Sequence, residues 1–226
     1  MAESPYHPTD RRPIAARRWP IWQRAAKWLA RRGVSPNAIS LAGMVCGIAA
    51  GVAFAGTTRA AGWEPFAWLG GAVLIQLRLL ANLLDGMVAI ESGRASLVGE
   101  LYNDVPDRVS DTAILIGAGY AAGGDVTLGC LAANAALFTA YVRAVGKAAG
   151  APQEYCGPMA KQQRMALLTL IAVYGGLAPA GWQPTWGDPA GRGLVAAGLL
   201  VITLGSLLTA VRRLMRISAN LKGGRE

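Results

Sequence analysis

Apolar residues along the chain fall into six long blocks, separated by short stretches rich in Gly, Pro and charged residues. The blocks cover about residues 37–56, 66–90, 98–121, 126–146, 163–180 and 192–211. An α-helix needs roughly 20 predominantly apolar residues to cross a bilayer core about 30 Å thick. Each block has about this length, so the pattern predicts an all-α polytopic membrane protein with six transmembrane helices.

The residues before the first block follow a different pattern. One helix face holds Trp22, Ala25 and Leu29, and another holds Arg24, Lys27 and Arg31. This alternation is typical of an amphipathic helix that lies on a membrane surface. The predicted organisation is a disordered cytoplasmic tail (1–16), an amphipathic interfacial helix (17–35), a six-helix membrane domain (36–213) and a basic cytoplasmic tail (214–226).

Composition and charge support this interpretation and add an orientation. The 226 residues are 53% hydrophobic and only 15% charged, with a formal net charge of +9. If both termini are cytoplasmic, Arg59 and Arg192 are the basic residues left on the opposite face, as the positive-inside rule requires. Basic residues that follow alternate loops in this way argue against nucleic-acid binding. We expect a multi-pass protein of the inner (cytoplasmic) membrane with both termini inside.

Polar side chains gather at the ends of the second and third blocks. Asn82 and Asp85 lie three residues apart, and Asn103 and Asp107 lie four apart, so each pair occupies one helix face. Ionisable groups at the edge of a span are costly and therefore functional by default. Their oxygens suit a hard divalent cation, Mg²⁺ or Mn²⁺, whereas His7, the single histidine, stands far from them. We expect a divalent metal site at the cytoplasmic edge and no zinc.

Basic residues in the neighbouring cytoplasmic loops indicate a phosphate ligand. Arg94 follows the second block, and Lys161 and Arg164 precede the fifth. A metal ion and a guanidinium group together clamp phosphoryl groups, and a spare carboxylate can accept a proton from a hydroxyl. Lys161 and Arg164 are candidates for binding an anionic acceptor or lipid phosphates. Ordinary positive-inside charge is the alternative for both, and a solvated loop arginine is the alternative for Arg94.

The spacing of these residues resembles the signature of the CDP-alcohol phosphatidyltransferases, D-x2-D-G-x2-A-R-x8-G-x3-D-x3-D. The chain reads Asn82-x2-Asp85-Gly86-x2-Ala89-Ile90-x8-Gly99-x3-Asn103-x3-Asp107, with every spacing kept and five identities. The resemblance implies that the hydroxyl of an acceptor displaces CMP from a CDP-linked lipid. It also implies an active site at the cytoplasmic face and a homodimer.

The resemblance further implies roles by position. Asp107 would be the catalytic base. The metal would be held by Asn82, Asp85, Asn103 and Asp107, with Asp104 as a further candidate. The CDP and phosphate groups would lie against Gly86, Ala89, Arg94, Ser96 and Gly99. Helix packing is the alternative for the two glycines, because small residues also let membrane helices approach closely.

Three departures from the signature leave alternatives open. Asn82 and Asn103 replace aspartates and Ile90 replaces the arginine, so the formal charge of the four ligand positions falls from −4 to −2 and favours one metal ion over two. Arg78, one turn before Asn82, could pair with Asp85 or with the next helix and compensate charge, or could be purely structural. Likewise, Asp104 could replace Asn103 as a ligand or pair with Arg108.

The same departures leave a second function open. A catalytically inert relative could keep the fold in order to bind a CDP-lipid or a partner protein. A small transporter fits less well, because the polar cluster lies at one membrane edge and no acidic chain crosses the other spans.

Overall fold

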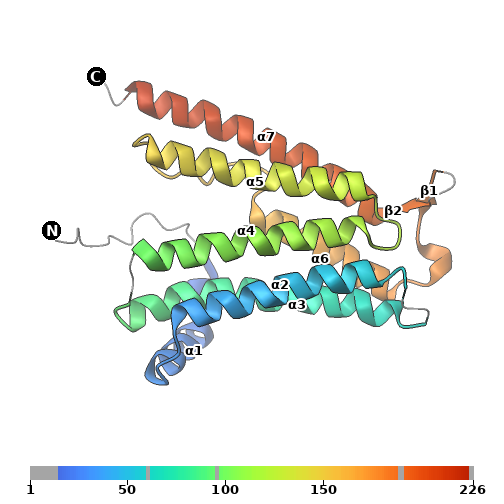
Figure 1. Ribbon diagram of the computed structural model, residues 1–226, viewed down its shortest axis with the longest axis horizontal. Coiled ribbons are helices and arrows are strands. Elements are labelled where there is room, and N and C mark those ends of the chain that lie inside the picture. Colours follow the sequence, from blue (N-terminus) through green and yellow to red (C-terminus); the bar gives the residue numbers. More distant parts are fainter. Residues whose placement is uncertain (1–14, 60–61, 95–96, 188–190, 224–226) are drawn as a thin grey trace. The chain divides into compact units, whose positions relative to one another are not determined.

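The computed structural model describes residues 15–59, 62–94, 97–187 and 191–223, and these are almost entirely helical (Figure 1). The helices are α1 (Pro20–Arg31), α2 (Pro36–Gly56), α3 (Glu64–Glu91), α4 (Leu97–Gly119), α5 (Val126–Ala148), α6 (Lys161–Leu177) and α7 (Leu194–Gly223). Two 3₁₀ turns, η2 (Ala15–Arg18) and η3 (Ala180–Trp182), and a short antiparallel pair, β1 (Thr185–Trp186) with β2 (Arg192–Gly193), complete the described elements.

A helix stands at each of the six predicted blocks. Among the described residues, four helical segments are long and apolar enough to cross a bilayer: Pro36–Gly56, Glu64–Glu91, Val126–Ala148 and Leu194–Lys222. The class of multi-pass membrane protein is therefore confirmed. The first half of α4 is rich in charged residues and α6 has only 17 residues, so the count of six spans stays a prediction.

The flanking segments compare with the predicted ones as follows. Most of the predicted tail 1–16 lies outside the described residues. In α1, the face with Trp22 and Leu29 is half-buried and Ala26 is buried. Trp19, Ile21 and Trp28 expose large apolar surfaces, as a membrane-facing helix would. At the other end, α7 continues as a helix to Gly223, beyond residue 213.

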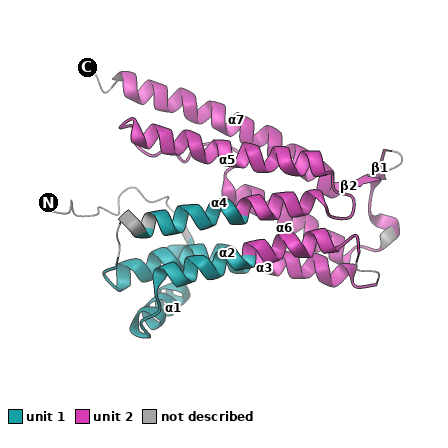
Figure 2. Ribbon diagram, viewed as in Figure 1, with its two compact units in different colours: residues 1–46, 76–110 teal, residues 47–75, 111–226 magenta. Residues whose placement is uncertain are grey.

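The chain forms two compact units (Figure 2). The first combines residues 1–46 and 76–110, and the second combines residues 47–75 and 111–226. Helices α2, α3 and α4 each contribute one part to the first unit and one to the second, whereas α5, α6 and α7 lie wholly in the second.

In the first unit, the end of α3 is set by a glycine. Gly93 has φ +64°, a left-handed conformation that glycine adopts without a Cβ penalty. It turns the chain so that the Arg94 N–H donates to the Ala89 carbonyl at 3.0 Å and the Gly93 N–H donates to the Ile90 carbonyl at 3.1 Å. These bonds satisfy carbonyls at the helix end. The turn leaves only a short link between the polar end of α3 and the polar start of α4.

In the second unit, small residues allow close helix packing. A Cβ atom at Gly117 of α4 would collide with the backbone of Gly51 of α2, and one at Gly146 of α5 would collide with Ile217 of α7. Helices α5 and α7 run side by side (Figure 1). Such contacts drive helix association in membranes, where lipid removes the hydrophobic driving force.

Side chains from α6 and α7 hold the link between α5 and α6 in place. Arg213 is buried and donates to the Thr139 carbonyl at 2.9 Å and to the Cys156 carbonyl at 3.0 Å. The Thr209 hydroxyl oxygen accepts from the Met159 N–H at 3.0 Å. The link is thus bonded to the bundle through its own backbone.

We predict that Asp125 stabilises the start of α5. Its carboxylate accepts from the Leu128 N–H at 2.9 Å and from Arg192 Nε at 2.8 Å. These two interactions hold the pKa of Asp125 below its ordinary value of 3.8, so its contribution is complete above that pH and is lost on acidification through the lowered pKa. Asp125→Ala should destabilise the protein by about 1 kcal/mol, measured as a lower midpoint of thermal unfolding in detergent at neutral pH.

Asp125→Asn is the matched control for this prediction. Asparagine caps a helix as well as aspartate but carries no charge for Arg192. We expect it to retain most of the stability, because an exposed ion pair contributes little. Equal loss in both variants would mean that the ion pair, and not the cap, is the stabilising interaction.

Candidate active site

A polar pocket opens between α2, α3 and α4 within the first unit. It is lined by Ser40, Gly43, Met44, Arg78, Asn82, Asp85, Asn103, Pro106, Asp107 and Ser110. The structure therefore brings together the four signature positions at which ligands were predicted, Asn82, Asp85, Asn103 and Asp107. They converge because each pair lies on one face of its helix and the turn after α3 brings the two faces together.

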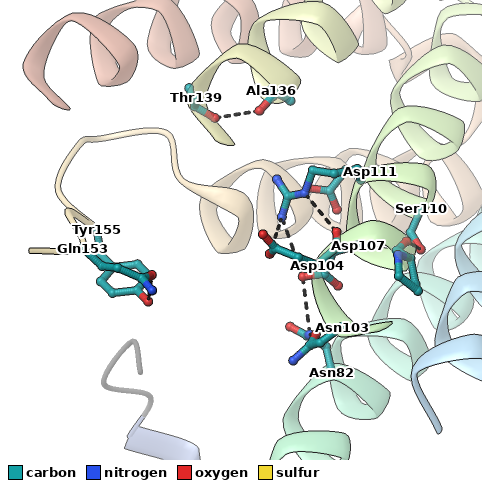
Figure 3. A network of polar contacts seen from close by, with 12 residues as sticks. Asn82, Asn103, Asp104, Asp107, Ser110, Asp111, Ala136, Thr139, Gln153 and Tyr155 are labelled. Atoms are coloured by element: carbon teal, nitrogen blue, oxygen red, sulfur yellow. Dashed lines mark hydrogen bonds and ion pairs between the residues drawn. The ribbon is translucent and has the colours of Figure 1, made fainter. Parts of the chain in front are cut away.

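The two asparagines contact each other across the pocket. Figure 3 shows Asn82 of α3 and Asn103 of α4 side by side, with Asp107 one turn further along α4. The Asn82 amide donates to Asn103 Oδ1 at 2.8 Å and to Asp107 Oδ2 at 3.4 Å. The amides thus join α3 to α4 at the positions where the signature has aspartates.

Asp85 is a buried carboxylate with two uncharged hydrogen-bond donors. Its side chain accepts from the Ser40 hydroxyl at 2.7 Å and from the Gly86 N–H at 2.5 Å, and Asp85 is 3% exposed. The Gly43 position lets α2 lie close to α3, since a Cβ there would stand 2.8 Å from the Ala81 Cβ. Ser40 was missed from the sequence. Its signal was a hydroxyl one turn before a glycine in an otherwise apolar block.

Asp107 forms an ion pair with a fully buried arginine. Arg78 Nη2 lies 2.9 Å from Asp107 Oδ1 and also donates to the Asp107 carbonyl at 3.1 Å. Arg78 is 1% exposed. Of the two partners considered from the sequence, Asp85 or a residue of the next helix, the structure shows the second, because Asp107 belongs to α4.

Asp104 and Arg108 lie toward the surface beside this pair. Arg108 Nη2 is 3.9 Å from Asp104 Oδ1 and 3.7 Å from Asp107 Oδ2. Asp104 is the more exposed of the two carboxylates, with half of its side chain accessible. The arrangement favours the ion-pair interpretation of Asp104 over a role as a metal ligand.

The residues predicted to bind CDP surround the ends of α3 and α4. Gly86 is buried, Ala89 and Gly99 are half-buried, and Arg94 is exposed just after α3. Ser96 lies outside the described residues. These placements keep a phosphate-binding role open without testing it.

The two predicted acceptor-binding residues belong to the second unit. Lys161 begins α6 and is half-buried. Arg164 is 2% exposed, pairs with Asp111 Oδ2 at 3.2 Å and donates to the Met159 carbonyl at 3.0 Å. A guanidinium group that is buried and bonded in this way favours a structural role for Arg164, which the sequence did not indicate.

The pocket has the donor chemistry of a hard divalent cation. In the described part of the chain, no three His, Cys, Asp or Glu side chains converge as a metal site. What converges is Asp85 with the amide groups of Asn82 and Asn103, and carboxylate and amide oxygens are the ligands that Mg²⁺ and Mn²⁺ take. A half-turn of the Asn82 amide presents its oxygen to the pocket, so the residues fit one such ion.

An oxygen-lined pocket at one end of apolar helices defines a membrane enzyme that handles a charged head group. No protein-family model matches the chain. The chain is 30% identical over 200 residues to the phosphatidylinositol phosphate synthase of Streptomyces avermitilis, which covers 85% of this chain and 75% of that one. It is 32% identical over 161 residues to the phosphatidylinositol phosphate synthase of Cutibacterium acnes, covering 68% of this chain and 75% of that one.

A solved structure has the same fold. The Mycobacterium tuberculosis phosphatidylinositol phosphate synthase PgsA1, in complex with manganese and citrate, superposes with a TM-score of 0.69 at 20% identity and covers 87% of this chain and 88% of that one. The same protein has also been solved with CDP-DAG bound. The chain belongs to the CDP-alcohol phosphatidyltransferase family. It is a membrane phosphatidyltransferase of phospholipid biosynthesis that uses a CDP-linked lipid.

We predict that Ser40 positions Asp85. Ser40→Ala removes a hydrogen bond to a buried carboxylate, an interaction of about 1.5–3 kcal/mol, and leaves that oxygen to reorient. Because groups that orient a ligand typically contribute 10–100-fold to affinity or activity, kcat/KM for CMP release should fall by at least about tenfold.

Ser110→Ala is the matched control. Ser110 lines the same pocket, but its hydroxyl donates to the Pro106 carbonyl of its own helix at 2.7 Å. This variant should keep nearly full activity. Equal loss in both serine variants would mean that pocket polarity, and not the bond to Asp85, is what matters.

Proposed function

We propose that the pocket formed by α2, α3 and α4 is the active site, where a hydroxyl acceptor displaces CMP from a CDP-linked lipid. One observation supports this proposal most strongly. Asn82, Asp85, Asn103 and Asp107 occupy the signature positions of the family and line one pocket. Loss of the chemistry would have left no reason for a buried carboxylate at position 85, which is costly to keep among apolar helices.

A divalent cation, Mg²⁺ or Mn²⁺, would be held by Asp85 with the amide oxygens of Asn82 and Asn103. When bound, such an ion neutralises the diphosphate and the negative charge that develops on the leaving phosphate. The binding of manganese by the structural relative is in keeping with this choice of ion. Asp107 and Asp104 are less favourable ligands, since both contact arginines.

Asp107 would act as the general base. Its Oδ1 is held by Arg78, whereas Oδ2 accepts only a long contact of 3.4 Å from the Asn82 amide. Oδ2 would take the proton of the acceptor hydroxyl while that oxygen forms a bond to the phosphorus next to the diacylglycerol. The bond from the same phosphorus to the CMP oxygen breaks, so the products are a phosphodiester lipid and CMP.

The nucleotide and its phosphates would lie along the ends of α3 and α4. Gly86, Ala89 and Gly99 have small side chains that permit close approach to the backbone, and Arg94 and Ser96 would contact phosphate. Ile90 occupies the position of the signature arginine, and its exposed side chain brings no charge. A cation from elsewhere in the chain must then balance the diphosphate.

A phosphorylated alcohol is the acceptor class that we propose. The two relatives above are named for phosphatidylinositol phosphate, so inositol phosphate is the first acceptor to test. Lys161 would contribute to binding the acceptor phosphate, and Arg164, if it contributes, would act mainly by fixing the start of α6.

The membrane arrangement follows from the same proposal. Six spans would place both termini and the active site at the cytoplasmic face of the inner membrane, with α1 lying in the interface. A homodimer is the proposed assembly.

The proposal is tested by CMP release from purified protein in detergent. CDP-diacylglycerol is supplied with and without Mg²⁺ or Mn²⁺, together with inositol phosphate, glycerol phosphate, inositol and serine as separate acceptors. We expect metal-dependent CMP release with one phosphorylated acceptor. Retained binding of CDP-diacylglycerol without CMP release would contradict the proposal and identify an inert relative.

We predict that Asp85→Asn abolishes this release. Asparagine keeps the shape and still accepts from the Gly86 N–H, but it removes the charge that would hold the cation. Because even indirect supports of a metal ligand contribute 10–100-fold, turnover should fall by more than about 100-fold. The elution profile in size-exclusion chromatography should stay unchanged. Full activity in the folded variant would exclude Asp85 as a ligand.

A further inference from the structure

The pocket contains a permanent positive charge that the reaction scheme has so far not used. Arg78 lies one turn before Asn82 on α3 and is 1% exposed. An arginine keeps its charge in proteins, because its pKa is far above neutral. Its guanidinium group lines the same pocket as Asp85 and Asp107.

The two pocket carboxylates differ in their surroundings. Asp107 is engaged by cationic and amide donors, through Arg78 at 2.9 Å and Asn82 at 3.4 Å. Asp85 accepts from the Ser40 hydroxyl and the Gly86 N–H, both uncharged. A metal ion can therefore take the Asp85 side of the pocket without displacing an ion pair, whereas an ion at Asp107 would have to compete with the guanidinium group.

Charge balance gives the same result. The carboxylates of Asp85 and Asp107 carry −2 and Arg78 carries +1, so the pocket has a net charge of −1 before any ligand binds. One divalent cation changes this to +1, which suits a diphosphate. A second would raise it to +3 in a mostly buried site, where like charges repel strongly.

We propose that Arg78 is a built-in substitute for a second metal ion. The site binds one divalent cation at Asp85, and the Arg78 guanidinium supplies the remaining positive charge opposite the diphosphate while fixing Asp107. This inference rests on the proposed function of the pocket and specifies its metal content. It also accounts for Asn82, since an aspartate one turn from Arg78 would compete with Asp107 for the same cation.

A purely structural ion pair between α3 and α4 would have the same contacts but a different consequence. If Arg78 only joins the helices, the number of metal ions does not depend on its charge. Metal stoichiometry therefore separates the two roles, and it requires no turnover.

The decisive comparison uses Asn82→Asp as a shared background. Purified protein in detergent is titrated with Mn²⁺ alone, and free Mn²⁺ is followed by electron paramagnetic resonance. Asn82→Asp and Asn82→Asp/Arg78→Met carry the same added carboxylate and differ only in the Arg78 charge. Asn82→Asp/Arg78→Lys retains that charge and is the matched control. Circular dichroism and size-exclusion chromatography confirm that each variant is folded.

We expect one Mn²⁺ per chain in the unaltered protein, in Asn82→Asp and in the Arg78→Lys double variant. The Arg78→Met double variant should bind a second Mn²⁺, at least tenfold more tightly than Asn82→Asp does. Two ions in the unaltered protein or in Asn82→Asp would overturn the inference, even if the Arg78→Met variant does not fold. One ion in the folded Arg78→Met double variant would overturn it as well.

CMP release under the same conditions separates this inference from the proposed function. Two Mn²⁺ ions together with CMP release would reject the role of Arg78 and keep the phosphatidyltransferase pocket. No Mn²⁺ binding and no CMP release would reject both. CMP release without any bound Mn²⁺ would reject the metal at Asp85 and the inference that depends on it.

Discussion

The ion pair between Arg78 and Asp107 is the interaction on which the site depends. Removing one member of a buried pair leaves an uncompensated charge and typically costs about 3–5 kcal/mol. Here the pair joins α3 to α4 inside a chain whose helices are otherwise mostly apolar. Its presence limits what its neighbours can be. Additional carboxylates at positions 82 and 103 would need additional cations, and the two amides in those places bond to each other instead.

The same constraint explains why several basic residues are not surface charges. In the second unit, Arg164 pairs with Asp111, and Arg213 donates to the Thr139 and Cys156 carbonyls. A guanidinium group has five donors in a fixed plane, so it can satisfy several buried oxygens at once. These arginines contribute to the positive-inside count, yet their bonds hold the link between α5 and α6 and leave less of their charge to bind a ligand.

The parts of the structure that depend on local pattern could be predicted from the sequence. A helix stands at each apolar block, and the two pairs of signature residues meet in one pocket because their spacing places each pair on one helix face. The contribution of Ser40 could not be predicted, since it depends on how closely α2 approaches α3 at Gly43. The partner of Arg78 required the same knowledge of neighbouring helices. For α4, the cost of charged residues and the need for a buried site act in opposite directions, and sequence alone does not resolve whether the helix spans the membrane.

Crystals grown with Mn²⁺ and CDP, measured at the manganese absorption edge, give the most direct test of the account. The anomalous map should show one manganese peak per chain beside Asp85, with the diphosphate of CDP in the pocket between α3 and α4 and the Arg78–Asp107 pair intact. Manganese or CDP bound away from this pocket would contradict the assignment of the active site.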